Sequence, residues 1–212
     1  MPEINVVYAD EALLVLDKPA GLLCVPGKGE DKHDCLSNRV QPHFADARVV
    51  HRLDMATSGL LLMARGAAAQ RTLNNAFASR EVHKRYVAVV DGVLAPPSAE
   101  WSVIDLPILL DWPNRPRRII DPQGKASCTR WRVLSQNPRE QTTRLELEPV
   151  TGRSHQLRVH LQALRHPILG DALYGTPASL AKAGRLLLHA TRLELTHPLS
   201  LQTMVFVSEP PF

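Results

Sequence analysis

Hydrophobic residues along the 212-residue chain gather in short runs separated by polar turns, a pattern typical of strands joined by hairpins. Apolar runs at 6–9 and 12–17 predict a first strand pair, which is followed by a loop rich in proline and glycine. Runs at 84–94, 126–134 and 142–150 predict three more strands, and 185–198 with 200–210 predict a closing strand pair. Shorter apolar runs at 49–50 and 60–64 read as buried strand.

Three segments have the spacing of helices instead. Residues 31–45 and 66–80 are expected to form two helices, and a third is expected after Thr151 and Gly152, with Ser154 as its N-cap. The positions expected to share one side are Ala68, Leu73, Ala76 and Phe77 in the second helix, and Leu157, Leu161 and Leu164 in the third. Because strands outnumber helices and most connections resemble hairpins, the pattern predicts an α+β fold with a mixed, largely antiparallel sheet.

Between residues 105 and 131 the pattern is less regular. Four prolines predict a long excursion with one turn at 121–124 before the strand at 126–134. Within it, the stretch WPNRPRR sets one aromatic ring among three arginines, Arg115, Arg117 and Arg118. This composition suits contact with RNA, whose backbone and splayed bases are exposed. The alternative is an ordered, proline-rich surface loop.

Charge supports a polyanionic partner only weakly. The net charge is +4, and residues 101–140 carry 7 Lys and Arg against 4 Asp and Glu, whereas residues 1–40 carry 4 against 7. A clustered basic region suits a polyanion, but a solvated basic face explains it equally well. No secretory signal opens the chain, and no apolar run approaches the roughly 20 residues that span a bilayer. Three cysteines without a CxxC pair favour a cytoplasmic protein with reduced thiols and disfavour a zinc site.

The stretch VVHRLDMATSGLLLMAR, residues 49–65, places Asp54 at the rim of the predicted core. A lone aspartate there is usually an Asx turn or an N-cap. Arg52 or Arg153 could instead hold it ionised and oriented, as a nucleophile or general base requires. Tyr86, on a predicted strand, is either a core residue or a platform on which a base stacks.

Two other groups of residues have both a structural and a functional interpretation. Lys18 opens a Pro-Gly loop that is either a turn or the border of a cleft, with Lys18 near a phosphate or propping the catalytic loop. His155 and His160 lie five residues apart on the predicted third helix. This is not the spacing that places two metal ligands on one helical face, so we expect two histidines satisfied by the helix and no metal.

Five blocks of the chain, in order, resemble the RluA-type pseudouridine synthases. HRLDMATSG matches the family's HRLD-xx-TSG signature, and DKPAGLLCVPG resembles its KPxG block. KRYVAVVDG, TGRSHQLRVHLQALRHPILGDALYG and LLLHA resemble the later blocks, so that the resemblance extends from about residue 6 to 207. It implies the pseudouridine synthase catalytic fold, with a central sheet in two lobes, flanking helices and a cleft between them.

The resemblance also implies roles for residues. Asp54 would be the catalytic aspartate, Arg52 would assist flipping of the nucleotide, Tyr86 would stack on the uracil, and Arg153 would pair with Asp54. Leu187 or Leu188 would form an apolar wall beside the base. Further substrate-binding residues are expected to be Lys18, His51, Thr57, Arg115, Arg117 and Arg118. No metal or other cofactor is implied, because the reaction is an isomerisation.

The resemblance implies that the partner is RNA, and no association with a membrane is expected. The expected targets are uridine 746 in a 23S rRNA hairpin and uridine 32 in the tRNA anticodon stem-loop. A single catalytic domain over 1–212, without the N-terminal S4 domain of many members, is expected to act as a monomer. Two alternatives remain. One is an inactive RNA-binding protein of the same fold, and the other is a hydrolase in which Asp54 and His51 or His155 activate water.

Overall fold

The computed structural model describes residues 4–29, 32–96 and 99–212, and the chain divides into two compact units. The first unit consists of the described residues of Met1–Lys84 together with His189–Pro211. The second consists of the described residues of Arg85–Leu188, with Phe212. Within the described ranges, no helix is long and apolar enough to cross a lipid bilayer.

The sheet of the first unit is mixed. Its strands follow the order β1 (Asn5–Ala9), β2 (Leu13–Lys18), β4 (Ser58–Arg65), β11 (Leu188–Thr196), with β12 (Thr203–Val207) on β11 and β3 (Ala47–Val49) on β4. These pairs are antiparallel except β4 with β11, which is parallel. The α+β class, the mixed sheet and the closing strand pair predicted from the sequence are therefore confirmed.

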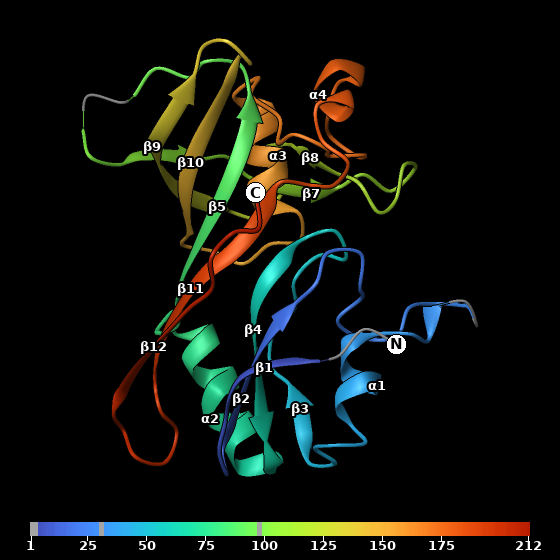
Figure 1. The fold of residues 1–212 in the computed structure, drawn as a ribbon, viewed down its shortest axis with the longest axis vertical. Helices are drawn as coiled ribbons and strands as arrows, with labels where there is room; N and C mark the ends of the chain where they lie inside the picture. Colours follow the sequence, from blue (N-terminus) through green and yellow to red (C-terminus); the bar gives the residue numbers. More distant parts are fainter. Residues whose placement is uncertain (1–3, 30–31, 97–98) are drawn as a thin grey trace. The chain divides into compact units, whose positions relative to one another are not determined.

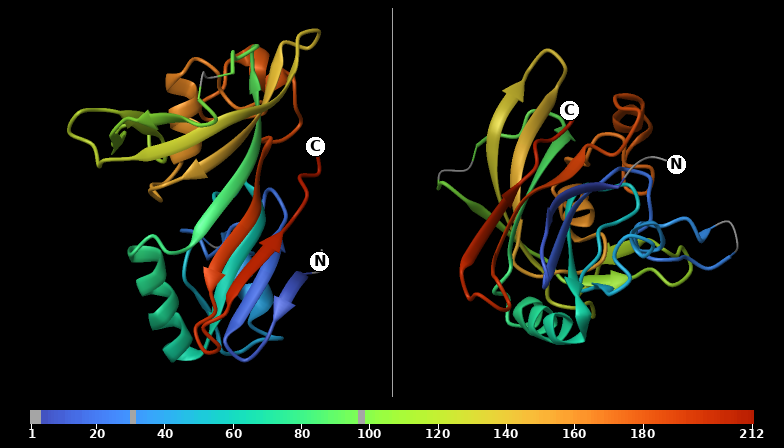
Figure 2. Two further views of the ribbon diagram at one scale, coloured as in Figure 1. Left: turned by 90° about the vertical axis from the view of Figure 1, so that its left-hand side faces the viewer. Right: turned by 60° about the horizontal axis from the view of Figure 1, so that its bottom comes forward.

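Strand β4 lies at the centre of this unit, and all its residues except Arg65 are buried. Helix α2 (Gly66–Ala78) packs against β3 and β4 and adds Leu73 to their apolar core (Figures 1 and 2). The helix rotates slightly from the predicted orientation, since Ala69 is buried where Ala68 was expected. Helix α1 covers only Leu36–Val40 of the predicted 31–45, of which residue 31 lies outside the described ranges.

The second unit has an antiparallel sheet in the order β5 (His83–Asp91), β10 (Thr142–Pro149), β9 (Cys128–Asn137), β6 (Ser102–Asp105). Helix α3 (Gln156–Ala163) packs against β9 and β10. A short helix, α4 (Pro177–Ala181), was not predicted, although Thr176 and Ser179 form a capping box at its start.

The proline-rich excursion is more regular than expected. It follows β6 and contains a hairpin of β7 (Ile108–Leu110) and β8 (Arg118–Ile120). The hairpin packs on α3 through a small core of Ile108, Val159 and Tyr174. Its loop therefore starts from a fixed base, and the predicted turn at 121–124 follows directly, where the Gly124 amide donates to the Asp121 carbonyl.

Candidate active site

The HRLDMAT motif forms the loop between β3 and β4. Asp54 is half-buried in this loop and Arg52 is exposed. The Thr57 amide donates to the Asp54 carbonyl at 3.1 Å, so the backbone turns back immediately after the aspartate. Thr57 itself is buried. The turn separates the half-buried Asp54 from the buried start of β4 at Ser58.

Lys18 supports this loop through a hydrogen bond to its backbone. Its side chain is fully buried, and Nζ donates to the carbonyls of Pro19 at 2.8 Å, Leu22 at 2.9 Å and Met55 at 3.1 Å. A buried ammonium must have its donors satisfied, and these carbonyls satisfy them. Lys18 therefore supports the loop that carries Asp54. Its expected contact with a substrate phosphate stays a prediction, to which its complete burial gives no support.

Two further groups of the KPAGLLC segment hold the same loop. The Gly21 amide donates to the Met55 carbonyl at 2.8 Å, with Gly21 at a positive φ of 85° that favours glycine. The Cys24 thiol lies between both polar groups of the Leu53 backbone, accepting from its amide at 3.2 Å and donating to its carbonyl at 3.1 Å. Burial raises the pKa of the Cys24 thiol and keeps the proton that it donates.

Gly59, the glycine of the TSG motif, sets the distance between strands β4 and β11. Gly59 pairs with Ala190 across the parallel β4–β11 contact and has a φ of 106°. A Cβ at this position would lie 2.4 Å from the Ala190 carbonyl oxygen. Only glycine lets these two strands approach so closely, which gives this motif position a physical reason.

His51 serves the strand rather than a reaction. Its Nε2 accepts a hydrogen bond from the Leu62 amide at 2.9 Å, and its ring stacks on Phe77. Burial, helped by the nearby Lys84 charge, lowers the pKa of His51 to about 3. The ring is therefore neutral at pH 7, and this lone pair is directed to a strand amide instead of to water or substrate. A hydrolytic role for His51 has no support in these contacts.

Tyr86 and the leucines of the LLLHA motif belong to the second unit. Tyr86 lies on β5 opposite Leu147 of β10 and is 9% exposed. Leu187, half-buried, accepts a hydrogen bond from the Val89 amide of β5 at 3.1 Å, and Leu188 is buried. The apolar wall expected from the resemblance thus lies beside the strand that carries Tyr86.

The loop that carries Arg153 is fixed by Gln156. The Gln156 Oε1 accepts from the Arg153 amide at 3.0 Å and from the Thr151 hydroxyl at 2.7 Å, while its Nε2 donates to the Cys128 carbonyl at 2.9 Å. Arg153 is exposed, and its Nε donates to the Ala126 carbonyl at 3.3 Å.

The predicted N-cap at Ser154 is wrong. Helix α3 begins at Gln156, and its N-cap is His155 in the left-handed region, at a φ of 58°. In the turn before the helix, the Arg153 amide donates to the Gln156 side chain and not to a serine cap.

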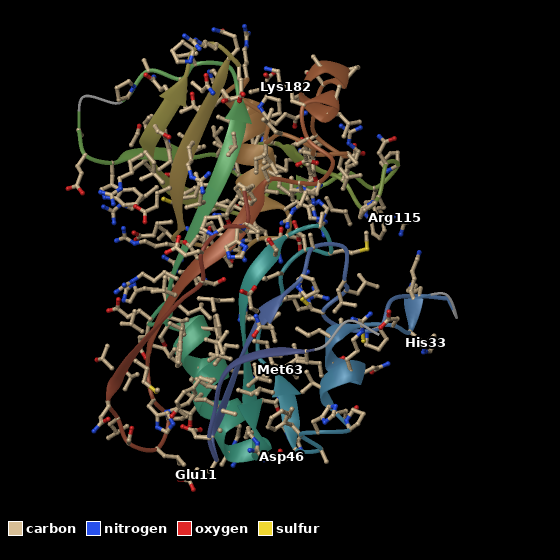
Figure 3. All side chains as sticks on the ribbon, viewed as in Figure 1. Glu11, His33, Asp46, Met63, Arg115 and Lys182 are labelled. Atoms are coloured by element: carbon tan, nitrogen blue, oxygen red, sulfur yellow. The ribbon has the colours of Figure 1, made fainter. Side chains whose placement is uncertain are left out.

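The β7–β8 hairpin presents the predicted RNA-binding arginines. Trp112 is 64% exposed, and the Arg115 guanidinium lies over its ring, 4.3 Å from the centroid. Figure 3 shows Arg115 on the connecting loop, beyond the ends of the two strands. Arg117 is also exposed, and Arg118 is half-buried.

Tyr174 connects the hairpin to α3. Its hydroxyl accepts from the Arg118 amide at 2.8 Å and lies 2.7 Å from Nδ1 of His155. Arg158, in a buried bidentate pair with Asp171, lies over the Tyr174 ring. His160 is buried, with its ring nitrogens on the Thr129 hydroxyl and the Leu106 carbonyl. His160 is thus a satisfied helix histidine, as predicted.

Sequence reasoning missed Cys24, Gln156 and Tyr174. Each stands inside one of the motif blocks, but its role depends on backbone groups far away in the sequence. In the described part of the chain, no three His, Cys, Asp or Glu side chains are grouped as metal ligands.

Known proteins resemble this chain over its whole length. The RNA pseudouridylate synthase family matches residues 12–163. The dual-specificity RNA pseudouridine synthase RluA of Escherichia coli strain K12 is 45% identical over 212 residues, 100% of this chain and 95% of that protein. The Yersinia pestis protein of the same name is 46% identical over 208 residues, 98% of this chain and 99% of that one.

A solved structure agrees with these sequence relatives. Human RNA Pseudouridylate Synthase Domain Containing 1 superposes with a TM-score of 0.81 at 28% identity, over 99% of this chain and 84% of that one. The family match spans most of the chain, and the motif that defines the loop of Asp54 lies within it. The chain belongs to the RNA pseudouridylate synthase family.

Proposed function

We propose that this RNA pseudouridine synthase modifies two classes of RNA, a hairpin of large-subunit ribosomal RNA and the anticodon stem-loop of tRNA. The relatives that match along the full chain are named dual-specificity enzymes. The observation that supports catalysis at Asp54 is the fixed backbone on either side of it, where Cys24 bonds to Leu53 and both Lys18 and Gly21 bond to Met55. We further propose that the protein works as a monomer in the cytoplasm, where both RNA classes are found.

The proposed reaction begins with extrusion of the target uridine. A stacked base hides its reactive atoms, so the nucleotide must flip out at an expense of about a few kcal/mol. Arg52, exposed on the loop, takes the space that the uridine leaves. Asp54 then attacks the nucleotide or removes a sugar proton, and the bond between N1 and C1′ breaks. The uracil turns and C5 bonds to C1′, which releases Asp54 or is accompanied by return of the sugar proton. C5 then loses its proton and N1 takes one up, so that the product is an isomer of the substrate.

The second unit contributes the platform for the freed base in this proposal. Tyr86 stacks on the uracil and assists removal of the C5 proton, and Leu187 or Leu188 closes the apolar side. Arg153 pairs with Asp54 and keeps the carboxylate ionised. Its loop is prepared for this task, because Gln156 fixes the backbone on which Arg153 is carried.

The β7–β8 hairpin is the proposed reader of the RNA. Arg115 and Trp112 form an exposed stacked pair, which offers a cation to a phosphate and a ring to a splayed base. Arg117 and Arg118 extend the positive charge toward the base of the hairpin. Loops with unpaired bases in stem-loop RNA are the natural partners of such a surface.

The test uses unmodified transcripts of the anticodon stem-loop and of the rRNA hairpin, with pseudouridine mapped by carbodiimide labelling and primer extension. The parent protein should give one stop on each RNA. Asp54→Asn should lose turnover by roughly 10⁴-fold and keep RNA affinity within about tenfold, because it removes one charge and almost no contact area. The matched control is Asp46→Asn, an exposed aspartate paired with Arg65, which should leave turnover unchanged.

Each outcome decides a different part of the proposal. A stop on one RNA alone would overturn the dual target. Turnover retained in Asp54→Asn would overturn the role of Asp54. Binding without any stop in the parent protein would favour the alternative of an inactive RNA-binding protein.

A further inference from the structure

A line of hydrogen bonds, the first of them buried, starts where the Asp54 loop ends. Ser58, the first residue of β4, lies with its hydroxyl 2.8 Å from Nδ1 of His189 on β11. Nε2 of His189 lies 2.9 Å from the Ser208 hydroxyl, which donates to Oδ2 of Asp17 on β2 at 2.6 Å. Ser58 and His189 are 3% and 2% exposed, so solvent does not replace these partners.

The bonds of this line point in one direction. Because the Ser208 hydroxyl gives its proton to Asp17, its oxygen accepts the next bond from N–H at Nε2 of His189. In the neutral imidazole Nδ1 then has the lone pair, and it accepts from the Ser58 hydroxyl. The Asp17 carboxylate thereby selects the tautomer of His189, and His189 orients Ser58.

Strand β2 supports the Asp54 loop at two points, Met55 within the loop and Ser58 just after it. Asp17 anchors the line that ends at Ser58, and the next residue, Lys18, holds the Met55 carbonyl. Successive side chains on a strand point to opposite faces, so the two neighbours act from opposite sides. The start of β4 is also fixed from β11, where His189 stands in register with Ser58. Asp54 directly precedes Met55 and lies four residues before Ser58, so both supports act on the chain just after it.

We propose that His189 is a positioning residue for the catalytic aspartate, acting through Ser58 on the end of the Asp54 loop. This inference rests on the proposed role of Asp54. His189 touches no reacting atom in it. A fully satisfied buried network rigidifies the segment that it joins, and in the described residues no buried side-chain nitrogen or oxygen lacks a partner. Loss of His189 removes the hydrogen bond that orients the Ser58 hydroxyl, so the end of the Asp54 loop is less firmly fixed.

His189→Ala should therefore slow the chemical step and spare binding. Under single-turnover conditions we expect the rate of pseudouridine formation to fall by about 10- to 100-fold, the range that a displacement of about 1 Å produces. The Kd for the RNA should stay within about threefold, because His189 is buried and contacts no RNA. Ser58→Ala should give a similar loss. The double variant should be no slower than His189→Ala, since both changes remove the same hydrogen bond.

His197 provides the matched control for mere loss of stability. It is 6% exposed, its Nε2 contacts Asp10 at 2.9 Å, and its Nδ1 accepts from the Ser200 amide at 2.9 Å. It thus joins the far end of β11 to the turn before β2, whereas His189 joins their other ends. His197→Ala should lower the melting temperature as His189→Ala does, and it should leave the single-turnover rate within about twofold.

Ser208→Ala keeps the inference testable if His189→Ala does not fold. It removes one hydroxyl and should reduce the single-turnover rate in the same direction but less, with an unchanged Kd. Equal rate losses in the His189 and His197 variants, or a full rate in both Ser208→Ala and His189→Ala, would overturn the positioning role. Those results leave the proposed function standing if Asp54→Asn is inactive. Turnover in Asp54→Asn would instead remove the basis of both.

Discussion

The loop of Asp54 and the loop of the β7–β8 hairpin are built by opposite means. Buried groups hold the first loop, because the Lys18 ammonium and the Cys24 thiol form hydrogen bonds with its backbone. The second extends from a packed base into solvent and carries Trp112 and Arg115 at its surface. Chemistry needs a group held within a fraction of an ångström, whereas phosphate recognition needs charge that can adapt to the RNA. Changes in the first loop should therefore alter rate, and changes in the second should alter affinity.

The largest effect is expected at Lys18. Lys18→Met keeps the length of the side chain and removes the donor from the Pro19, Leu22 and Met55 carbonyls. Each buried acceptor left without its partner costs about 1–3 kcal/mol. We expect a clear fall in melting temperature and a single-turnover rate lower by about 100-fold, measured below the new melting transition with RNA affinity determined alongside.

Lys182 is the control for this substitution. Its Nζ pairs with Asp91 in the second unit and donates to the Glu140 and Gln141 carbonyls at 3.0 and 3.2 Å, but its side chain is 33% exposed, so water can replace these partners. A partly exposed pair contributes about 0–1 kcal/mol, so Lys182→Met should change neither the rate nor the melting temperature appreciably. A normal rate in folded Lys18→Met would show that the aspartate does not depend on the support beneath its loop.

Neutralising the hairpin should give a smaller effect and a different one. Replacing Arg115, Arg117 and Arg118 together by Gln should weaken RNA binding by about tenfold or more at low salt. It should reduce the slope of log Kd against log salt by roughly 0.7–0.9 for each phosphate that the hairpin no longer neutralises. The single-turnover rate at saturating RNA should stay near that of the parent protein. Titrations at several salt concentrations measure both quantities.

A charge-matched triple variant separates local contact from net charge. Arg85, Arg130 and Arg132 surround Trp101 in the same unit, but they are paired with Glu146, Glu148 and Glu100. Their replacement by Gln should leave the salt slope within about one unit of the parent value, because these cations already have carboxylate partners. Equal slopes in the two triple variants would mean that net charge, and not the hairpin, attracts the RNA.

The sequence predicted the fold class and most strands, but it did not predict how the helices begin and end. The alternation of short apolar runs predicted the α+β class and most strands, because each pattern reflects burial of its own segment. The order of the motif blocks pointed to the RNA pseudouridylate synthase family. The short form of α1 and the wrong cap at Ser154 have a different origin. They depend on particular hydrogen bonds that hydrophobic periodicity does not show, such as that from the Leu36 amide to the Leu23 carbonyl and that from the Arg153 amide to the Gln156 side chain.

Lys18 shows the same limit at a single residue. The sequence placed it before a Pro-Gly loop and left open a simple turn, a phosphate contact and a propping role. The decision came from its complete burial and from the Met55 carbonyl, 37 residues away along the chain. A local sequence pattern does not show a contact between residues so far apart in the chain, so only the three-dimensional structure revealed how Lys18 supports the loop.

The smallest expected effect concerns His51, at the start of the Asp54 loop. Burial first, and then the Lys84 charge, lower the pKa of His51 to about 3, while an unfolded histidine titrates near 6.5. Between these values the unfolded chain binds a proton that the folded chain does not. The free energy of unfolding should thus fall as the pH drops below about 6.5, by at most about 1.4 kcal/mol per pH unit from this residue.

His51→Gln cannot titrate and keeps an acceptor for the Leu62 amide. Between pH 6.5 and 4.5, above the lowered pKa values of Asp10 and Asp34, urea unfolding of the variant should therefore depend less on pH than that of the parent. The buried His160 titrates in both proteins, so the difference between the two slopes belongs to His51. Parallel slopes would mean that His51 takes up its proton in the folded protein, which would return it to the groups able to exchange a proton beside Asp54.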